Sequence, residues 1–279
     1  MNKTNQLLIK AIGKTINSTS IVAPKYASKK ALNLFATPRK GHYKKSHHKV
    51  VSDAVFKTFT TNHLSIATYH WLGSGKTILL AHGWESNASR WKDLLKVLKE
   101  KRYNIIAFDG PAHGKSGGQQ FSAILHADFI ATLCKVFQPE IIIGHSVGGM
   151  STIFCQYKHQ FKFVKTIISL GAPAHFEGVF SRYRKMMGYN KRVWKYLNKL
   201  VYDKFGYPVE YFSAAEFSKS ISAKTLIIHD KYDLIIPYND ALLLHKCFMN
   251  STLISTEGFG HGLKNETVNQ HIIEFLENK

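Results

Sequence analysis

The sequence predicts an open, mostly parallel β-sheet with helices on both faces, in a chain of 279 residues. Short apolar runs such as Ile141–Ile143 alternate with longer stretches of helical periodicity, which is typical of this α/β class. Turns rich in glycine follow several of these runs. Hydrophobic residues make up 44% of the chain, which is enough for a buried core and excludes a disordered protein.

The predicted sheet begins near residue 54. Ala54–Thr60 and Leu64–Leu72 alternate in polarity and are expected to pair as an antiparallel hairpin. The remaining strands are expected at Thr77–Ala81, Asn104–Phe108, Ile141–Ile143, Val164–Leu170, Thr225–Ile228 and Ser251–Ser255. Helices are expected between them, at about 87–101, 121–137, 150–158, 238–247 and 264–277. Sheets of this kind carry their functional groups beyond the carboxyl ends of the strands.

A basic N-terminal arm, residues 1–50, differs from the rest of the chain. It holds eleven Lys and Arg residues and no acid, so it supplies over half of the net charge of +20. Two short helices are expected at Gln6–Thr15 and Ala27–Phe35, and Pro38 then breaks the chain. We interpret the arm as a segment whose apolar residues dock on the main domain at 51–279. Contact with an anionic membrane surface is the alternative, whereas nucleic acid is disfavoured because no aromatic residues interleave the basic ones.

Residues 174–218 interrupt the alternation of strands and helices. The segment is rich in aromatic and basic residues and leans towards helix. An insertion at this point of a parallel sheet predicts a helical cap over a pocket, with an ordinary helical layer as the simpler interpretation. Aromatic side chains in such a cap indicate an apolar acyl or alcohol group in the substrate.

Three cysteines and the absence of long apolar runs bear on location. Cys134, Cys155 and Cys247 lie far apart in apolar surroundings, which favours buried thiols in a reducing compartment. No run approaches 18 apolar residues, and the N-terminus lacks a signal-peptide core. A cytoplasmic protein is therefore expected, with peripheral membrane association as an option.

The pentad Gly144-His145-Ser146-Val147-Gly148 follows the buried run Ile141–Ile143 and precedes a helical segment. Strand, sharp turn and helix with a serine at the turn predict a strained backbone that projects the hydroxyl above the sheet edge. Gly144 and Gly148 are expected to be small because a Cβ would clash where strand and helix meet. Ser146 is the candidate nucleophile.

A serine nucleophile needs a base to accept its proton and an anion to orient that base. His261 follows the last strand between glycines and is the candidate base. Asp233 is the preferred acid, because the loop after its strand gives it the reach to His261. Asp230 is the competing acid. The order Ser, Asp, His, each beyond a strand, suits this architecture.

An oxyanion formed on the substrate needs two backbone N–H donors. We expect them at Val147, directly after the serine, and at Trp84, after the strand Thr77–Ala81. His82, Gly83 and His145 flank these donors and are expected to contact the substrate.

Together these motifs resemble the α/β-hydrolase superfamily, and more narrowly its capped esterase, lipase and serine-aminopeptidase-like members. The resemblance covers about residues 54–279 and rests on Leu79–Trp84, Phe108–Ser116, Gly144–Gly149, Asp230–Asp233 and Gly260-His261. It implies an eight-stranded sheet, a triad of Ser146, Asp233 and His261, and no cofactor or metal. Asp230 replaces a usual glycine, which leaves the choice of acid open. A serine at the turn argues against the dehalogenase and epoxide-hydrolase members.

The sequence therefore predicts a serine hydrolase that cleaves a carboxylic ester in a small acyl substrate, with a thioester or small amide as alternatives. Two other functions stay open. One is a non-catalytic binding protein with the same fold, since a fold alone does not fix function. The other is a lipase or acyltransferase that the basic arm guides to a membrane surface.

Overall fold

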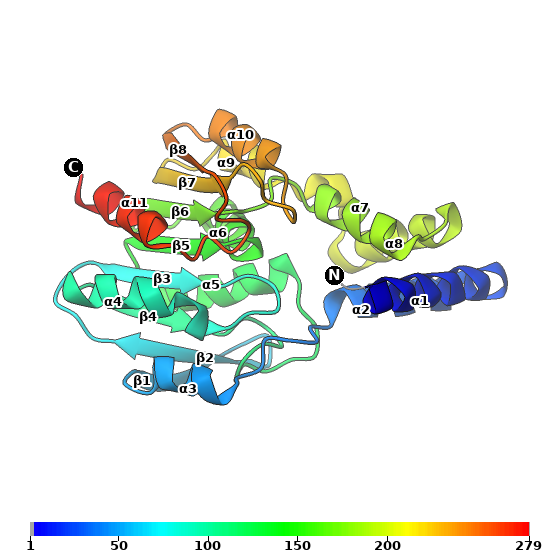
Figure 1. The fold of residues 1–279 in the computed structure, drawn as a ribbon, viewed down its shortest axis with the longest axis horizontal. Coiled ribbons are helices and arrows are strands. Elements are labelled where there is room, and N and C mark those ends of the chain that lie inside the picture. The colour runs from blue at the N-terminus through cyan, green and yellow to red at the C-terminus, as the bar shows by residue number, and fades with distance from the viewer. Residues whose placement is uncertain (1–2, 279) are drawn as a thin grey trace. The chain divides into compact units, whose positions relative to one another are not determined.

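An eight-stranded β-sheet forms the centre of the larger of two compact units in the computed structural model, which describes residues 3–278 (Figure 1). This sheet unit comprises Pro38–Ala174 and Ala214–Lys279. Its strands are β1 (Val55–Thr61), β2 (Leu64–Trp71), β3 (Thr77–Ala81), β4 (Asn104–Phe108), β5 (Ile141–His145), β6 (Thr166–Leu170), β7 (Lys224–Asp230) and β8 (Ser251–Thr256).

The strands are ordered β1-β2-β4-β3-β5-β6-β7-β8. β1 and β2 form the expected antiparallel hairpin, β2 runs antiparallel to β4, and every other neighbouring pair is parallel. This mostly parallel sheet confirms the predicted fold class. Ala81 lies opposite both Phe108 and Gly144, and His145 lies opposite Leu170, so neighbouring strands end level with one another. The loops that follow them therefore start from one edge of the sheet.

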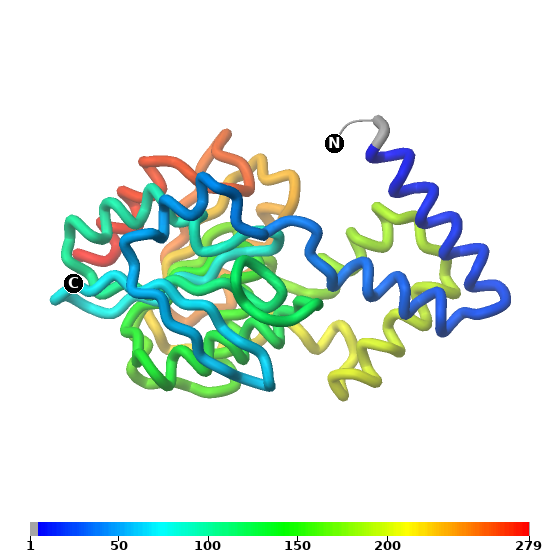
Figure 2. Tube along the Cα trace, turned by 90° about the horizontal axis from the view of Figure 1, so that it is seen from below, coloured from blue at the N-terminus to red at the C-terminus, as the bar shows by residue number. Residues whose placement is uncertain are grey.

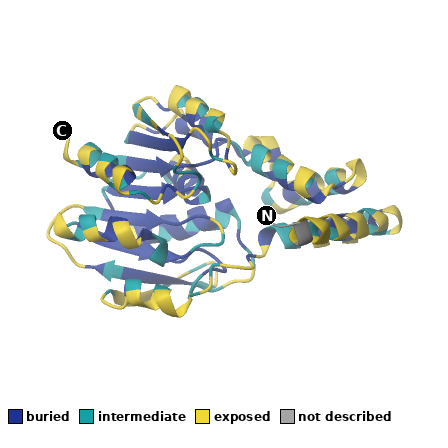
Figure 3. Ribbon diagram, in the orientation of Figure 1, coloured by how far each residue is buried: buried dark blue, intermediate teal, exposed yellow. Residues whose placement is uncertain are grey.

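Helices cover both faces of the sheet, and the central strands β3 to β7 are buried between them (Figure 3). On one face, alternate strand residues such as Ile78 and Leu80 share a core with η1 (Ala88–Trp91), α4 (Lys92–Glu100) and α11 (Glu266–Glu277). The other face carries a row of α5 (Ala123–Phe137), α6 (Val147–His159), α9 (Ala214–Ser218) and α10 (Tyr238–Cys247). A short helix, α3 (Lys45–Val51), packs beside η1.

The second compact unit is helical and is built from two segments distant in sequence, Met1–Thr37 and His175–Ser213. In Figures 1 and 2 its N-terminal helices lie beside those of the later segment. The elements are α1 (Lys3–Val22), α2 (Pro24–Ala36), α7 (Phe176–Met187), α8 (Lys191–Phe205) and η2 (Val209–Tyr211).

Aromatic packing and close backbone contact hold this helical unit together. Phe35 of α2 packs edge-on against Phe180 of α7, with ring centroids 5.2 Å apart. The Tyr183 hydroxyl donates to the Ala31 carbonyl over 2.9 Å. A Cβ on Gly13 would lie 1.7 Å from the Met187 carbonyl oxygen, so only glycine allows α1 to approach α7 this closely.

The N-terminal residues are more helical than the sequence indicates, and they divide between the two units. The predicted helices Gln6–Thr15 and Ala27–Phe35 extend to Lys3–Val22 and Pro24–Ala36, because each packs on partners in α7 and α8 that local sequence does not reveal. Residues 38–50 instead join the sheet unit. No helix within residues 3–278 is long and apolar enough to cross a membrane.

Candidate active site

Ser146 lies at the turn between β5 and α6 in a conformation that side-chain-bearing residues rarely adopt, with φ 54° and ψ −126°. Two glycines make this turn possible. A Cβ on Gly144 would lie 2.6 Å from the Gly149 Cα, and one on Gly148 would lie 2.3 Å from the Ala81 carbonyl oxygen. Both distances are far below van der Waals contact, so the turn brings strand and helix backbones into direct contact.

A chain of hydrogen bonds joins Ser146, His261 and Asp233. The Ser146 Oγ lies 3.0 Å from His261 Nε2, and His261 Nδ1 lies 2.7 Å from Asp233 Oδ2. When Nδ1–H donates to the carboxylate, Nε2 is left without a proton and can accept one from the serine. The Asp233 side chain is 1% exposed and that of His261 is 21% exposed, so water reaches the imidazole but not the acid.

The Asp233 carboxylate is held as an anion by several donors. Its Oδ1 accepts the backbone N–H groups of Ile235 and Ile236 over 2.7 and 3.0 Å. Burial by itself would raise the pKa of Asp233, but hydrogen bonds from His229, His261 and these two amides outweigh it and hold the pKa well below its ordinary value. An ionised carboxylate is what an adjacent imidazolium requires.

His229 is a contact of the acid that the sequence analysis missed. Its side chain is fully buried, and its Nε2 lies 3.0 Å from the Ile236 carbonyl and 3.4 Å from Asp233 Oδ2. It thereby ties the carboxylate to the loop that carries it. The sequence feature that could have indicated this contact is the position of His229 near the end of a buried strand, four residues before Asp233.

Asp230, the competing acid, contacts the loops and not the base. Its Oδ2 accepts the Thr256 hydroxyl and the Phe259 N–H, and its Oδ1 accepts the Tyr232 N–H, over 2.8 to 3.0 Å. Burial opposes its charge, but these donors prevail and lower the pKa of Asp230. The carboxylate therefore braces the loop leading to His261, while Asp233 reaches the imidazole.

Two backbone N–H groups beside Ser146 are unused by the described residues. Val147 is the first residue of α6, where helix N–H groups have no intrahelical partner, and Trp84 follows β3. Gly83 brings the Trp84 loop against the serine, since a Cβ on Gly83 would lie 3.0 Å from the Ser146 Cβ. Both predicted oxyanion donors are therefore free among residues 3–278.

The side chains of His82 and His145, both expected near the substrate, form hydrogen bonds within the protein. The His82 ring is fully buried, its Nδ1 pairs with the Gly83 carbonyl, and its Nε2 accepts the Gly110 N–H over 2.7 Å. His145 Nε2 donates to the His261 carbonyl over 2.8 Å, and its Nδ1 is buried. Burial lowers the pKa of both rings well below the ordinary value, so both are neutral. Both histidines thus connect loops around Ser146, and their contact with a substrate stays a prediction.

Asp109, at the end of β4, braces the same edge of the sheet. Its carboxylate accepts the Ala88 and Lys115 N–H groups and the hydroxyls of Tyr43 and Tyr69 over 2.9 to 3.2 Å. Burial raises the pKa of Asp109 to about 6, although the four donors oppose the rise. Within residues 3–278 no group of three or more His, Cys, Asp or Glu side chains could hold a metal ion.

Comparison with known proteins places this chain in a family. A family model described as "Alpha/beta hydrolase family" matches residues 78–230, more than half of the chain. The chain belongs to the alpha/beta hydrolase family. A second model, described as "TAP-like protein", matches residues 206–279 of this hydrolase. The first match begins within β3, includes the Ser146 turn and ends with β7, and the second includes His261.

Individual relatives of this alpha/beta hydrolase are distant. It is 24% identical over 257 residues to a non-heme haloperoxidase of Rhodococcus erythropolis, covering 74% of this chain and 93% of that protein. It is 22% identical over 267 residues to the uncharacterized hydrolase YugF of Bacillus subtilis, covering 79% and 97%. An esterase structure from Exiguobacterium antarcticum superposes with a TM-score of 0.63 at 18% identity, covering 81% and 100%. This last likeness concerns the fold alone.

Proposed function

We propose that this alpha/beta hydrolase is a serine hydrolase that cleaves carboxylic esters, with thioesters and small amides as further substrates. The observation that carries the proposal is the unbroken hydrogen-bond chain from Ser146 through His261 to Asp233. Membership of the family supports the reaction class. One relative, the uncharacterized hydrolase YugF, carries a name that agrees with it.

The reaction proceeds in two halves. Ser146 Oγ attacks the ester carbonyl as His261 Nε2 takes its proton, and the Asp233 carboxylate stabilises the imidazolium. The oxyanion accepts hydrogen bonds from the Trp84 and Val147 N–H groups, and the α6 dipole favours its charge. His261 then returns the proton to the leaving alcohol, which leaves an acyl group on the serine. Water attacks this acyl group with the same base, and the acid product departs.

Active-site labelling tests the nucleophile. A fluorophosphonate probe should label the wild-type protein and Ser151→Ala but not Ser146→Ala. Ser151 is a matched control in α6, the helix that follows Ser146, and it is fully buried with no hydrogen-bond partner among the described residues. Esterase activity should fall by about 10⁴-fold or more in Ser146→Ala and remain in the control. Equal labelling of all three proteins would refute the assignment.

A substrate panel separates the bond types. Nitrophenyl esters of increasing chain length, a thioester and an aminoacyl amide should be compared by kcat/KM. A kcat/KM that rises with acyl chain length would indicate an apolar acyl pocket. If the probe labels Ser146 but the protein hydrolyses none of these compounds, the result would instead favour a binding or transfer role for the same site.

A specific observation favours a second role, association with an anionic membrane surface through the helical unit. Its two segments carry fourteen Lys and Arg residues and three acids, a net charge of +11. On α1 the side chains of Leu7, Leu8, Ile21 and Val22 are 59% to 86% exposed. Exposed apolar residues on a basic helix are typical of helices that lie in the membrane interface.

Vesicle sedimentation tests this second role. Vesicles containing anionic phospholipid should bind the wild-type protein, whereas neutral vesicles should not. Leu8→Gln/Ile21→Gln should weaken binding by about tenfold or more, because two apolar side chains no longer enter the interface. The double variant should fold normally, since both side chains are exposed. Unchanged binding of the double variant would exclude α1 as the docking helix.

A further inference from the structure

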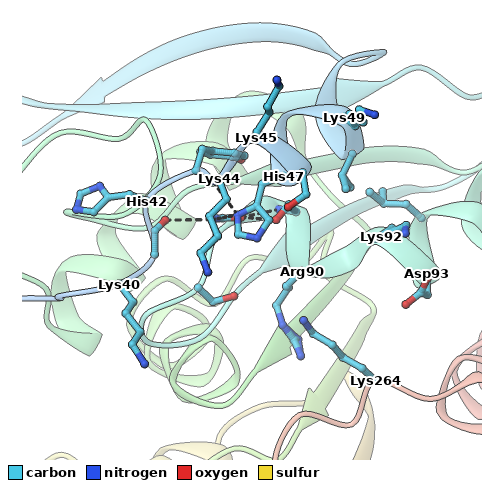
Figure 4. Close-up of a pocket in the computed structure, with 18 of the residues that line it drawn as sticks. Lys40, His42, Lys44, Lys45, His47, Lys49, Arg90, Lys92, Asp93 and Lys264 are labelled. Atoms are coloured by element: carbon cyan, nitrogen blue, oxygen red, sulfur yellow. Dashed lines mark hydrogen bonds between the residues drawn. The ribbon is translucent and has the colours of Figure 1, made fainter.

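A large hollow lined by basic side chains lies within the sheet unit, apart from the hydrogen-bond chain of Ser146 (Figure 4). We call it the basic groove. It is open to solvent, has a volume of about 1330 Å³, and lies between the segment 39–50 on one side and η1 with α4 on the other, with Lys264 adding to its lining. Ten Lys and Arg residues line it: Arg39, Lys40, Lys44, Lys45, Lys49, Arg90, Lys92, Lys96, Lys99 and Lys264.

Few of these cations are neutralised by the protein. The lining holds three acids, Asp53, Glu85 and Asp93. Asp53 pairs with Lys99 over 2.7 Å, and Glu85 Oε1 accepts the Arg39 backbone N–H. Within the described residues, the other nine cations form no ion pair. The groove thus has seven more cations than acids, on both of its walls.

The cations at one end of the groove are partly desolvated as well as crowded. Arg90 and Lys264 lie next to one another (Figure 4). Burial lowers the pKa of the Arg90 guanidinium to about 9, so it is still charged at neutral pH. Burial and the charge of Arg90 together lower the pKa of Lys264, and burial with Lys44 and Lys264 lowers that of His47. A bound anion would relieve this repulsion.

The shape and lining of the groove indicate which class of anionic ligand it can bind. A single phosphate would leave most of 1330 Å³ empty, whereas cations on both walls suit several phosphates spread through one molecule. A flat bilayer surface does not fill a hollow. Tyr43 is the one phenyl-type ring of the described lining, and it packs on Tyr69 and His48 with its hydroxyl on Asp109, so it offers no free face for a nucleic-acid base.

We propose that the basic groove is a binding site for a soluble polyphosphorylated small molecule, one that carries at least three phosphate groups. Lysines from the segment 39–50 and from α4 contact the outer phosphates, and Arg90 and Lys264 hold the innermost one. The groove is also joined to the candidate active site, because Arg90 Nη2 donates to the Gly262 carbonyl, next to His261, over 2.9 Å. The proposal does not depend on the proposed hydrolase function, since binding is measured directly.

Inorganic tripolyphosphate is the probe, and calorimetric titration of the full chain is the measurement. The groove variant is Lys44→Gln/Lys49→Gln/Lys96→Gln, which removes exposed cations from both walls. The matched control is Lys57→Gln/Lys135→Gln/Lys162→Gln, three exposed lysines of the same unit outside the groove. Both variants lose the same net charge, so a general electrostatic effect would appear equally in both.

Wild type should bind one tripolyphosphate saturably, and the groove variant should bind it about 10- to 100-fold more weakly while the control is unchanged. Ser146→Ala should bind like wild type, which separates this test from that of hydrolase activity. Equal weakening in both triple variants would overturn the proposal, as would no saturable binding at millimolar tripolyphosphate. Groove-dependent binding seen only with phosphoinositide vesicles or single-stranded RNA would also overturn it, in favour of a membrane or nucleic-acid partner.

Discussion

Exchanging the two acids of the loop after β7, one at a time, tests the hydrogen-bond chain most directly. Asp233→Asn replaces the acceptor of the His261 Nδ1–H by an amide, which stabilises neither the required tautomer nor the imidazolium. The same exchange in a serine triad lowers kcat by about 10⁴-fold, or about 5.5 kcal/mol in activation free energy. We expect a loss of about 10³- to 10⁴-fold here.

Asp230→Asn is the matched control, three residues away and chemically identical. It weakens three hydrogen bonds that brace the loops, from Tyr232, Thr256 and Phe259. An amide oxygen retains part of this network, so we expect a loss of about 2 to 3 kcal/mol in unfolding free energy and less than about tenfold in kcat. Ester hydrolysis well below the unfolding midpoint and urea denaturation provide the two readouts. A larger kcat loss in Asp230→Asn than in Asp233→Asn would refute our assignment of the acid.

Substitutions at Gly148 and Asp109 test the tight turn beside Ser146 and the buried carboxylate at the end of β4. Gly148→Ala places a Cβ 2.3 Å from the Ala81 carbonyl oxygen, so it should cost several kcal/mol of unfolding free energy and most of the activity. Gly178→Ala in α7 is the control. A Cβ there meets only the flexible Arg182 side chain, so this change should be neutral or slightly stabilising. Equal stability of both by thermal denaturation would contradict the tight turn. Asp109→Asn should change the pH dependence of stability. The pKa of Asp109 in the folded protein is raised to about 6, so its stabilising contribution is fully present below about pH 4 and is lost as the pH rises through 6. The difference in unfolding free energy between wild type and Asp109→Asn should therefore shrink by about 3 kcal/mol over this range. A constant difference between pH 4 and 7 would argue against a buried, ionising Asp109.

The strands could be predicted closely because a buried parallel strand is a short apolar run with no exposed face. Thr77–Ala81 and Asn104–Phe108 are observed at their predicted bounds. The Ser146 turn could also be predicted from the sequence, because the close contact of strand and helix requires glycine at positions 144 and 148. The preference for Asp233 over Asp230 rested on loop reach alone, because the sequence does not show which loop donors each carboxylate meets. His229 stayed hidden for the same reason, as its contact with Asp233 is made in three dimensions.

The basic arm is one continuous segment in the sequence, but its cations belong to two different units of the structure. Eleven cations precede residue 51, yet six lie within Met1–Thr37 of the helical unit, and five line the basic groove of the sheet unit: Arg39, Lys40, Lys44, Lys45 and Lys49. The boundary falls at Pro38, the residue that the sequence marks as a break. Deleting residues 1–48 would therefore remove a proposed membrane surface and one wall of a proposed phosphate site together. Loss of anion binding after that deletion could not be assigned to either. Substitutions confined to exposed side chains of α1, or to lysines on the groove walls, keep the two roles separable because each leaves the other unit intact.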